Sequence, residues 1–220
     1  MQNKRTALLL IVICNSYAVS AQVQVSKEPL HKLSLENKYI RLLDVNIEPG
    51  DTTMFHIHST PSVFVHYTTT MVCTQIKGQE WQSGKNTIGN ASYRSFENDT
   101  LVHRVSNCDT VPFHVTDVEL LSAYKPEQKL EPLPFPLLFE NERVVAYRLM
   151  ASELNGEIIK DRGPMVAQMV AGRQVIIHNE KGKELSRLKS GEYFYIDPGA
   201  AFYFSADGDA GINMVLFEIK

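Results

Sequence analysis

Residues 50–58 read Gly-Asp-Thr-Thr-Met-Phe-His-Ile-His, with His56 and His58 separated by a single residue. On a β-strand, residues i and i+2 project from the same face, so these two imidazoles point together while Ile57 points away. Two imidazoles side by side can chelate a divalent metal. The segment therefore predicts a strand that carries the first two ligands of a metal site.

A third ligand has to come from another strand, because one strand cannot curl its own distant residues back onto a single point. The candidate is His103, which lies within Leu-Val-His-Arg-Val at 101–105. It follows His58 by 45 residues, far enough for intervening strands to return the chain. The competing interpretation is that the His-x-His pair is only a polar pair on a strand.

Short segments rich in β-branched and aromatic residues recur along the chain and indicate many strands. They cover 39–45, 63–73, 111–121, 144–149, 166–170, 174–178, 192–196 and 211–219. Turn signals separate them at 49–51, 179–182, 198–199 and 207–209. There is no long 3.6-residue period, and only a short helix near 152–155 is expected. This pattern predicts an all-β sandwich or barrel.

A proline-rich stretch divides the chain into two halves. Pro126, Pro132, Pro134 and Pro136 disfavour a central strand and suit an extended connector. The halves also echo each other: Glu-Asn-Lys at 36–38 opens the first and Glu-Asn-Glu at 140–142 opens the second, followed in each case by a β-type run. A duplicated unit of about 100 residues accounts for that spacing.

The residues around the histidines resemble a known family. Gly50, five intervening residues and His-x-His look like the first motif of the cupin superfamily, and 103–107, His-Arg-Val-Ser-Asn, is similar to the end of its second motif. The resemblance implies two tandem jelly-roll (double-stranded β-helix) barrels or sandwiches. It also implies a divalent metal, one of Fe, Mn, Ni, Cu or Zn, held by His56, His58 and His103. It covers 36–120 well and 140–220 more weakly, at turn-like stretches 188–192 and 197–199.

The departures from that family pattern shape the functional expectation. Many metal-binding cupins have a glutamate four or five residues after the second histidine, where this chain has Ser62 and Val63. In the second half, Phe202 stands in the place that aligns with His103, and no His-x-His follows residue 140. We therefore expect a metal site in the N-terminal cupin domain, 22–121, then a Pro-rich linker, 122–139, and a degenerate C-terminal cupin-like domain without metal, 140–220.

The function that follows is metal chemistry on a small molecule. A site of three neutral imidazoles leaves the bound ion dicationic, which favours an anionic or enolisable ligand that coordinates in two places. By resemblance, a dioxygenase-type oxidoreductase is the first hypothesis. A non-catalytic binder of metal or small molecule, and a metal-dependent isomerase or lyase, are the alternatives. No catalytic residue is assigned beyond the metal ligands.

Other side chains are weaker candidates. Ser62, Trp81, Tyr93 and Arg94 are candidate pocket residues, although a turn serine and a surface arginine are the ordinary interpretations of two of them. His66 is expected to be a solvated or core histidine. Three further histidines have no partners in sequence and are assigned no chemistry: His31, His114 and His178.

The N-terminus has the layout of a secretory signal peptide. Lys4 and Arg5 precede an apolar run that ends at Cys14, and a small-residue cleavage site follows, so cleavage after Ala21 is expected. A lipoprotein anchored at Cys14 is the alternative. The expected location is periplasmic or extracellular, with no membrane association after cleavage. In an oxidising compartment Cys73 and Cys108 could pair, but two buried free thiols are the favoured expectation.

Charge excludes some partners. Removal of residues 1–21 takes away two basic and no acidic residues, so the formal net charge moves from −3 to −5. An acidic surface gives no support to nucleic-acid or anionic-membrane binding. The expected partner is a small-molecule ligand, and a homodimer is left open.

Overall fold

The computed structural model describes residues 22–126, 130–206, 208 and 211–220, so the predicted signal peptide lies outside the described residues. Strands dominate, as predicted, and the helical content of the described residues is two short 3-10 turns, η1 (Val25–Lys27) and η2 (Ala151–Glu153). The second of these falls where the short helix was expected. No helix in this part of the chain has the length and hydropathy needed to cross a bilayer.

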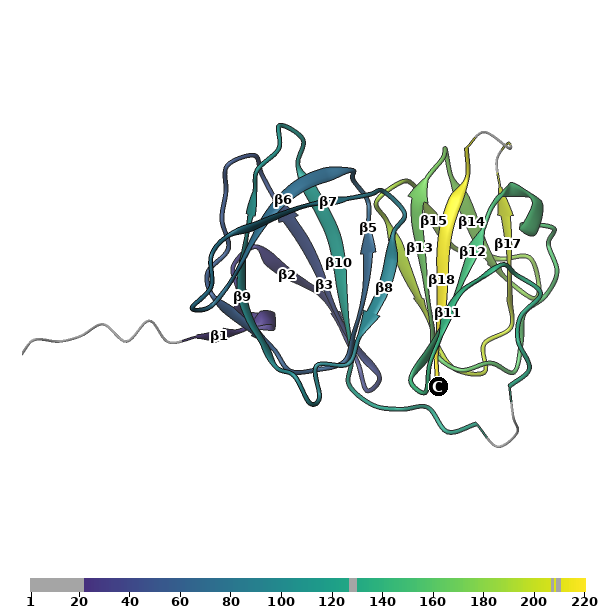
Figure 1. The fold of residues 1–220 in the computed structure, drawn as a ribbon. Helices are drawn as coiled ribbons and strands as arrows, with labels where there is room; N and C mark the ends of the chain where they lie inside the picture. Colours follow the sequence, from purple (N-terminus) through teal and green to yellow (C-terminus); the bar gives the residue numbers. More distant parts are fainter. Residues whose placement is uncertain (1–21, 127–129, 207, 209–210) are drawn as a thin grey trace, which may run out of the picture.

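Residues before the Pro-rich stretch form two five-stranded sheets that face each other (Figure 1). The first sheet has the order β1-β4-β9-β6-β7, and its strands are β1 (Val23–Gln24), β4 (His56–His58), β6 (Thr70–Ile76), β7 (Gln82–Asn86) and β9 (Leu101–Asn107). The second has the order β2-β3-β10-β5-β8, with β2 (His31–Glu36), β3 (Ile40–Ile47), β5 (Ser62–His66), β8 (Ala91–Arg94) and β10 (Phe113–Leu120).

Residues after the stretch form another pair of sheets. One has the order β11-β12-β18-β13-β16, made of β11 (Leu137–Glu140), β12 (Val144–Leu149), β13 (Met165–Ala171), β16 (Tyr193–Ile196) and β18 (Asn213–Ile219). The other has the order β15-β14-β17, made of β14 (Val175–Asn179), β15 (Glu184–Leu188) and β17 (Phe202–Ala206). Within the described residues, each of these sheets is open, with one edge strand on either side. The fold is therefore all-β with two-sheet packing, and closure into tandem barrels stays a prediction.

Strand β3 shows how the two-residue period builds the core. Leu43, Val45 and Ile47 point between the two N-terminal sheets and pack in one buried cluster with Val72 and Val115. The other face of the same sheet is also apolar and packs against the second half of the chain. A sheet buried on both faces explains why β3 reads as a nearly continuous apolar run.

The core between the halves combines residues of β3, β5 and β10 with residues of β12, β13 and β18. Its members are buried, and they include Ile40, Leu42, Val63, Val118, Val144, Val166, Val215 and Phe217. A polar contact lies within it. The side chain of the fully buried Gln168 accepts hydrogen bonds from Tyr67 Oη and Thr116 Oγ1, each at 2.7 Å. The two halves therefore share a core rather than being joined only by the connector.

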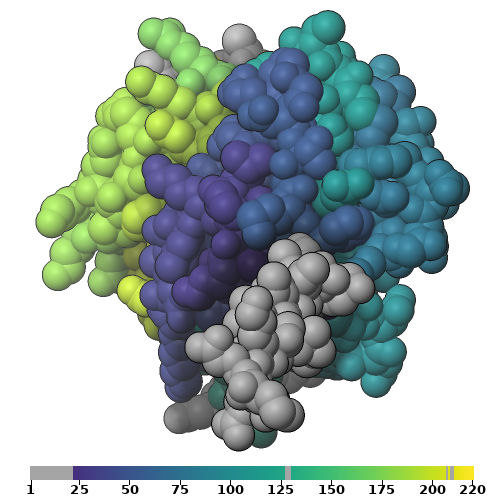
Figure 2. Space-filling model, turned by 90° about the vertical axis from the view of Figure 1, so that its left-hand side faces the viewer, coloured from purple at the N-terminus to yellow at the C-terminus, as the bar shows by residue number. Residues whose placement is uncertain are grey.

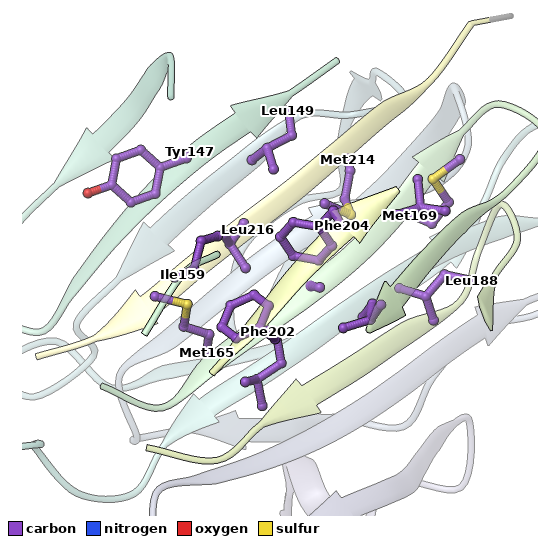
Figure 3. Close-up of a cluster of buried hydrophobic side chains, with 14 of the residues drawn as sticks. Tyr147, Leu149, Ile159, Met165, Met169, Leu188, Phe202, Phe204, Met214 and Leu216 are labelled. Atoms are coloured by element: carbon purple, nitrogen blue, oxygen red, sulfur yellow. The ribbon is translucent and has the colours of Figure 1, made fainter. Parts of the chain in front are cut away.

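The interior of the second half is filled by apolar side chains (Figure 3). Phe202, which stands where the sequence alignment would place the third histidine, is 1% exposed and packs with Met165 and Phe204 in this cluster. Within the described residues, the only group of three or more histidine, cysteine or acidic side chains arranged to hold a metal lies in the first half.

Two sequence expectations need correction. The stretch 63–73, taken as one run, is two strands, because the chain turns between β5 and β6. Cys73 and Cys108 are not free thiols but form a disulfide with a Cα–Cα distance of 5.9 Å. Their pairing follows from the topology: β6 lies beside β9 with Cys73 opposite Ser106, and Cys108 comes immediately after β9 ends.

Candidate metal centre

The His-x-His segment forms a short strand whose alternation is the one expected from its sequence. In β4, His56 and His58 are buried and Ile57 is less so. The preceding turn contains Gly50 at φ 85°, a backbone conformation that L side chains rarely adopt, which gives a local reason for glycine at that motif position. Strand β4 then pairs antiparallel with β9.

That pairing brings the third histidine to the other two. His103 lies directly opposite His56 in the ladder between β4 and β9. One ligand atom from each of His56, His58 and His103 lies within 4.8 Å of the others. The Nε2 atoms of His58 and His103 are 3.0 Å apart. Two metal–nitrogen bonds of about 2.1 Å at a right angle separate their nitrogens by about 3.0 Å, so this pair has the spacing of adjacent ligands.

The ring nitrogens of His56 show which atom is available to a metal. Its Nδ1 donates to the carbonyl oxygen of Met54 at 2.9 Å, so the proton of a neutral ring is held at Nδ1. The remaining nitrogen, Nε2, is buried and has no hydrogen-bond partner. A buried polar atom without a partner is costly and calls for an explanation, and a bound cation supplies one here.

A buried carboxylate stands behind His58. Asp117, on β10, is 1% exposed, and its Oδ2 lies 3.4 Å from His58 Nδ1. This contact is not a hydrogen bond: His58 Nδ1 and both carboxylate oxygens of Asp117 are buried without a hydrogen-bond partner. A carboxylate on the far nitrogen of a ligating imidazole fixes the orientation of the ring and raises its basicity. Asp117 is therefore placed to support His58 as a ligand.

Burial keeps two of the three ligands, His56 and His103, in the neutral form that a metal needs. Burial lowers the pKa of His56 to about 3, with a further contribution from neighbouring His31 and His58. Burial also lowers the pKa of His103 to about 2, again assisted by the other histidines. The donor set therefore fits a divalent ion with a preference for imidazole, such as Zn, Cu, Fe or Ni.

The three histidines line a cavity of about 190 Å³ inside the first half. Most of its wall is apolar, from Val45, Ile47, Phe64, Val72, Val105, Phe113 and Val115. Its other polar lining residues are His31, His66, Thr74, Asn86 and Asp117. The volume is below the range typical of drug-sized ligands, so the cavity suits a compact molecule.

The four candidate pocket residues lie outside this cavity lining. Ser62 is fully buried, and its hydroxyl donates to the carbonyl oxygen of Thr60. Tyr93 packs at the core between the halves. Arg94 pairs with Asp99 near the surface, and the exposed Trp81 lies over the Arg104 guanidinium. Arg94 is linked to the centre indirectly, because its guanidinium lies over the Phe96 ring, which stacks on His58.

Sequence reasoning missed three residues beside the centre: Asp117, His31 and Glu28. A usable signal existed for Asp117, because it is an acidic residue within the apolar run 111–121 on the alternation that includes Val115. No comparable signal exists for His31. Its ring centroid lies 4.7 Å from that of His56, although the two residues belong to different sheets.

A second, larger cavity of about 270 Å³ lies in the other half, beside the buried ion pair of Arg162 and Glu218. No metal-type group is found there among the described residues. Among the described residues, the metal-type group therefore lies in the smaller cavity and not in the larger one.

No family model matches this sequence, and no curated protein matches it. Solved structures do resemble the fold. AerE from Microcystis aeruginosa has a TM-score of 0.55 at 13% identity over 88% of this chain and 98% of its own. A salicylate 1,2-dioxygenase from Pseudaminobacter salicylatoxidans has a TM-score of 0.55 at 13% identity, over 82% of this chain and 71% of its own.

A cupin 2 conserved barrel domain protein from Leptotrichia buccalis also aligns, with a TM-score of 0.53 and 12% identity over 86% of this chain and 88% of its own. Identities this low support the fold alone. Together with the two-sheet architecture and the cluster of His56, His58 and His103, they show that the described chain has the cupin fold with a three-histidine group able to hold a metal.

Proposed function

We propose that this chain is a metal-dependent cupin protein that binds a small molecule at His56, His58 and His103, with dioxygenase-type oxidation as its reaction. The observation that carries the proposal is the meeting of three imidazoles, two buried and one partly buried, from two strands at a small cavity. The similarity of fold to a salicylate dioxygenase supports the reaction class without identifying the substrate.

The residues of the chain have separable roles in this proposal. His56, His58 and His103 would hold the ion, which would supply Lewis acidity to a bound substrate. Asp117, whose Oδ2 lies 3.4 Å from His58 Nδ1, would orient His58. Phe64, Val105 and the other apolar wall residues exclude water, which strengthens electrostatic interactions at the centre.

The glutamate position of many cupins contributes no carboxylate here. Ser62 and Val63 are both fully buried, and Val63 belongs to the core between the halves. A centre without that base also suits the alternative function, binding of a metal-chelating small molecule without turnover.

The test is metal analysis of purified protein, followed by oxygen uptake with candidate thiols, diketones and flavonoids. We expect about one divalent ion per chain. Replacement of His103 with Ala should remove most of it, because two imidazoles make a much weaker site. His178→Ala, in the second half, is the matched control. Absence of metal from the wild type, or full metal retention by His103→Ala, would refute the proposal.

Oxygen uptake separates the two functions. Consumption with any candidate substrate that is lost in His103→Ala supports oxidation. A metal-loaded protein that binds these compounds but consumes no oxygen supports the binding function instead.

We also propose that the protein is exported. The predicted signal peptide and the Cys73–Cys108 disulfide both support an oxidising compartment outside the cytoplasm. Mass spectrometry of protein recovered from its host should find a mature chain that begins at Gln22. A recovered chain that still begins at Met1 would contradict export with removal of a signal peptide.

A further inference from the structure

A carboxylate–imidazole pair faces the metal-site cavity from the N-terminal segment. His31, at the start of β2, is 8% exposed, lines the cavity and packs edge-on against His56. Its Nδ1 lies 2.7 Å from Oε2 of Glu28, which is itself 3% exposed. In the space-filling view of Figure 2, the part of the chain that contains both residues is purple and lies against residues of the first half coloured blue.

Glu28 is held in place on several sides. Its Oε2 also accepts a hydrogen bond from the backbone N–H of Leu30, and its Oε1 accepts one from that of Met54 at 3.1 Å. Burial opposes ionisation of the carboxyl, but the hydrogen bond from His31 and those from the backbone outweigh burial and lower the pKa of Glu28. The ionised carboxylate can only accept, so the Nδ1 of His31 carries a proton and donates to it.

This geometry leaves Nε2 as the one ring nitrogen of His31 that a ligand in the cavity can use. Glu28 also connects to the metal ligands themselves: its oxygen accepts from Met54 N–H, while the carbonyl of Met54 accepts from His56 Nδ1. The pair is thus fixed relative to His56 by a continuous set of hydrogen bonds.

His31 is not a member of the group whose ligand atoms lie within 4.8 Å of one another. His31 lines the same cavity as His56, His58 and His103, so its ring is within the space that a molecule bound there would occupy. The orienting carboxylate is characteristic of an imidazole that accepts a proton or a hydrogen bond from a bound substrate. The other polar residues of the lining, apart from the three histidines, are His66, Thr74, Asn86 and Asp117.

We propose that His31, positioned by Glu28, contacts the bound substrate and selects small anions that chelate the metal through a carboxylate and an adjacent protonated oxygen, whose O–H donates a hydrogen bond to His31 Nε2. The proposal rests on the metal-binding function proposed above. It names the substrate class as small hydroxy or enol acids. A dicationic centre attracts the carboxylate of such a molecule, and His31 recognises its hydroxyl hydrogen.

The test uses Co(II)-loaded protein and two matched probes, glycolate and methoxyacetate. Both can chelate through a carboxylate and the neighbouring oxygen, but methoxyacetate has a methyl group where glycolate has the hydroxyl proton. Titration followed by the visible spectrum of Co(II) gives each Kd. We expect His31→Phe to weaken glycolate binding at least tenfold, to change methoxyacetate binding less than twofold, and to leave one Co(II) per chain.

Further variants separate a binding role from a structural one. His31→Gln is the second variant at the same position, in case Phe prevents folding, and should also reduce the preference for glycolate over methoxyacetate. Glu28→Gln should reduce it several-fold, as expected of a positioning residue. The control is His114→Gln, because His114 is paired with Asp44 at 2.8 Å but lies outside the cavity lining. It should leave both affinities unchanged.

Equal glycolate binding by the wild type and both His31 variants, with metal retained, would overturn the inference. Loss of Co(II) from the His31 variants alone would also overturn it, by making His31 a metal ligand. A wild-type protein that takes up no Co(II) would instead refute the metal-binding function, so the two failures are distinguishable.

Discussion

At the scale of single residues, the centre depends on groups that support the ligands as much as on the ligands themselves. Asp117 is a buried carboxylate whose Oδ2 lies 3.4 Å from His58 Nδ1, and neither of its oxygens has a hydrogen-bond partner. It comes from β10, in the sheet opposite to β4, so it does not occupy the sequence position of the cupin glutamate. The chain therefore brings a carboxylate close to the histidines from β10, whereas the position of the cupin glutamate falls at Ser62 and Val63 on β5.

Replacement of Asp117 with Asn should lower metal affinity by about 10–100-fold, the range typical for partners of ligating histidines. The amide removes the charge while keeping the size of the side chain. Competition of the loaded protein against a chelator of known affinity measures the change. Asp44→Asn in the same sheet is the control. Unchanged metal affinity in Asp117→Asn would show that this carboxylate does not support His58.

His66 makes the protein sensitive to acid. Burial lowers the pKa of His66 from 6.5 to about 4. At pH values between 4 and 6.5, His66 is therefore protonated in the unfolded chain and neutral in the folded chain. Stability contributed by this difference is present above pH 6.5 and is lost as pH falls toward 4. The 2.5-unit difference corresponds to roughly 3 kcal/mol.

His66→Leu should therefore lose less stability on acidification than the wild type, by roughly 2–3 kcal/mol between pH 7 and pH 4.5. Urea unfolding at the two pH values gives the comparison. His178→Leu in the second half is the control. If acidification lowers the unfolding free energy of the wild type and of His66→Leu equally, His66 is not a neutral, buried histidine in the folded protein.

At the scale of elements, the disulfide ties β6 to the end of β9, the strand that carries His103. It closes a loop of 35 residues, which restricts the unfolded chain. The loop-entropy relation gives about 4 kcal/mol for such a loop.

The double variant Cys73→Ser, Cys108→Ser should therefore lose about 3–4 kcal/mol of unfolding free energy. Equilibrium unfolding in urea measures it, with wild type under reducing conditions as a second comparison. A stability equal to that of the oxidised wild type would show that the bond contributes nothing. Because the loop ends next to β9, we also expect weaker metal retention in the variant.

Much of the element pattern could be predicted from sequence, because strand periodicity and turn residues are local signals. The alternation in 50–58 correctly predicted that His56 and His58 share a face. His103 could be proposed as the third ligand for two reasons. The spacing of 45 residues from His58 allows another strand to return to the site, and the cupin resemblance implies that it does. The Cys73–Cys108 pairing, and the approach of His31 to His56 from another sheet, depend on tertiary packing and leave no local trace.

At the scale of the whole molecule, the second half covers one sheet of the first. The buried cluster between them contains Leu42 and Val118 from one side and Val166 and Phe217 from the other. Gln168 lies within this apolar contact and accepts from Tyr67 and Thr116. The contact between the two halves therefore includes hydrogen bonds to a buried amide as well as apolar packing.

Replacement of Gln168 with Leu should destabilise the protein by roughly 1–3 kcal/mol, because it leaves the buried Tyr67 and Thr116 hydroxyls without their acceptor. The triple variant Tyr67→Phe, Thr116→Val, Gln168→Leu removes the hydroxyls too and should recover much of the loss. Thermal and urea unfolding test both variants. Equal stability of Gln168→Leu and wild type would show that the hydroxyls find other partners.

The shared core has one more consequence. The sheet that carries Asp117 has its outer face covered by residues of the same polypeptide, so the covering surface is always present at the local concentration set by the connector. Had that surface belonged to a separate subunit, dilution would uncover the sheet. For a protein proposed to leave the cell, where its own concentration is low, a metal site supported by this sheet keeps its shape at any dilution.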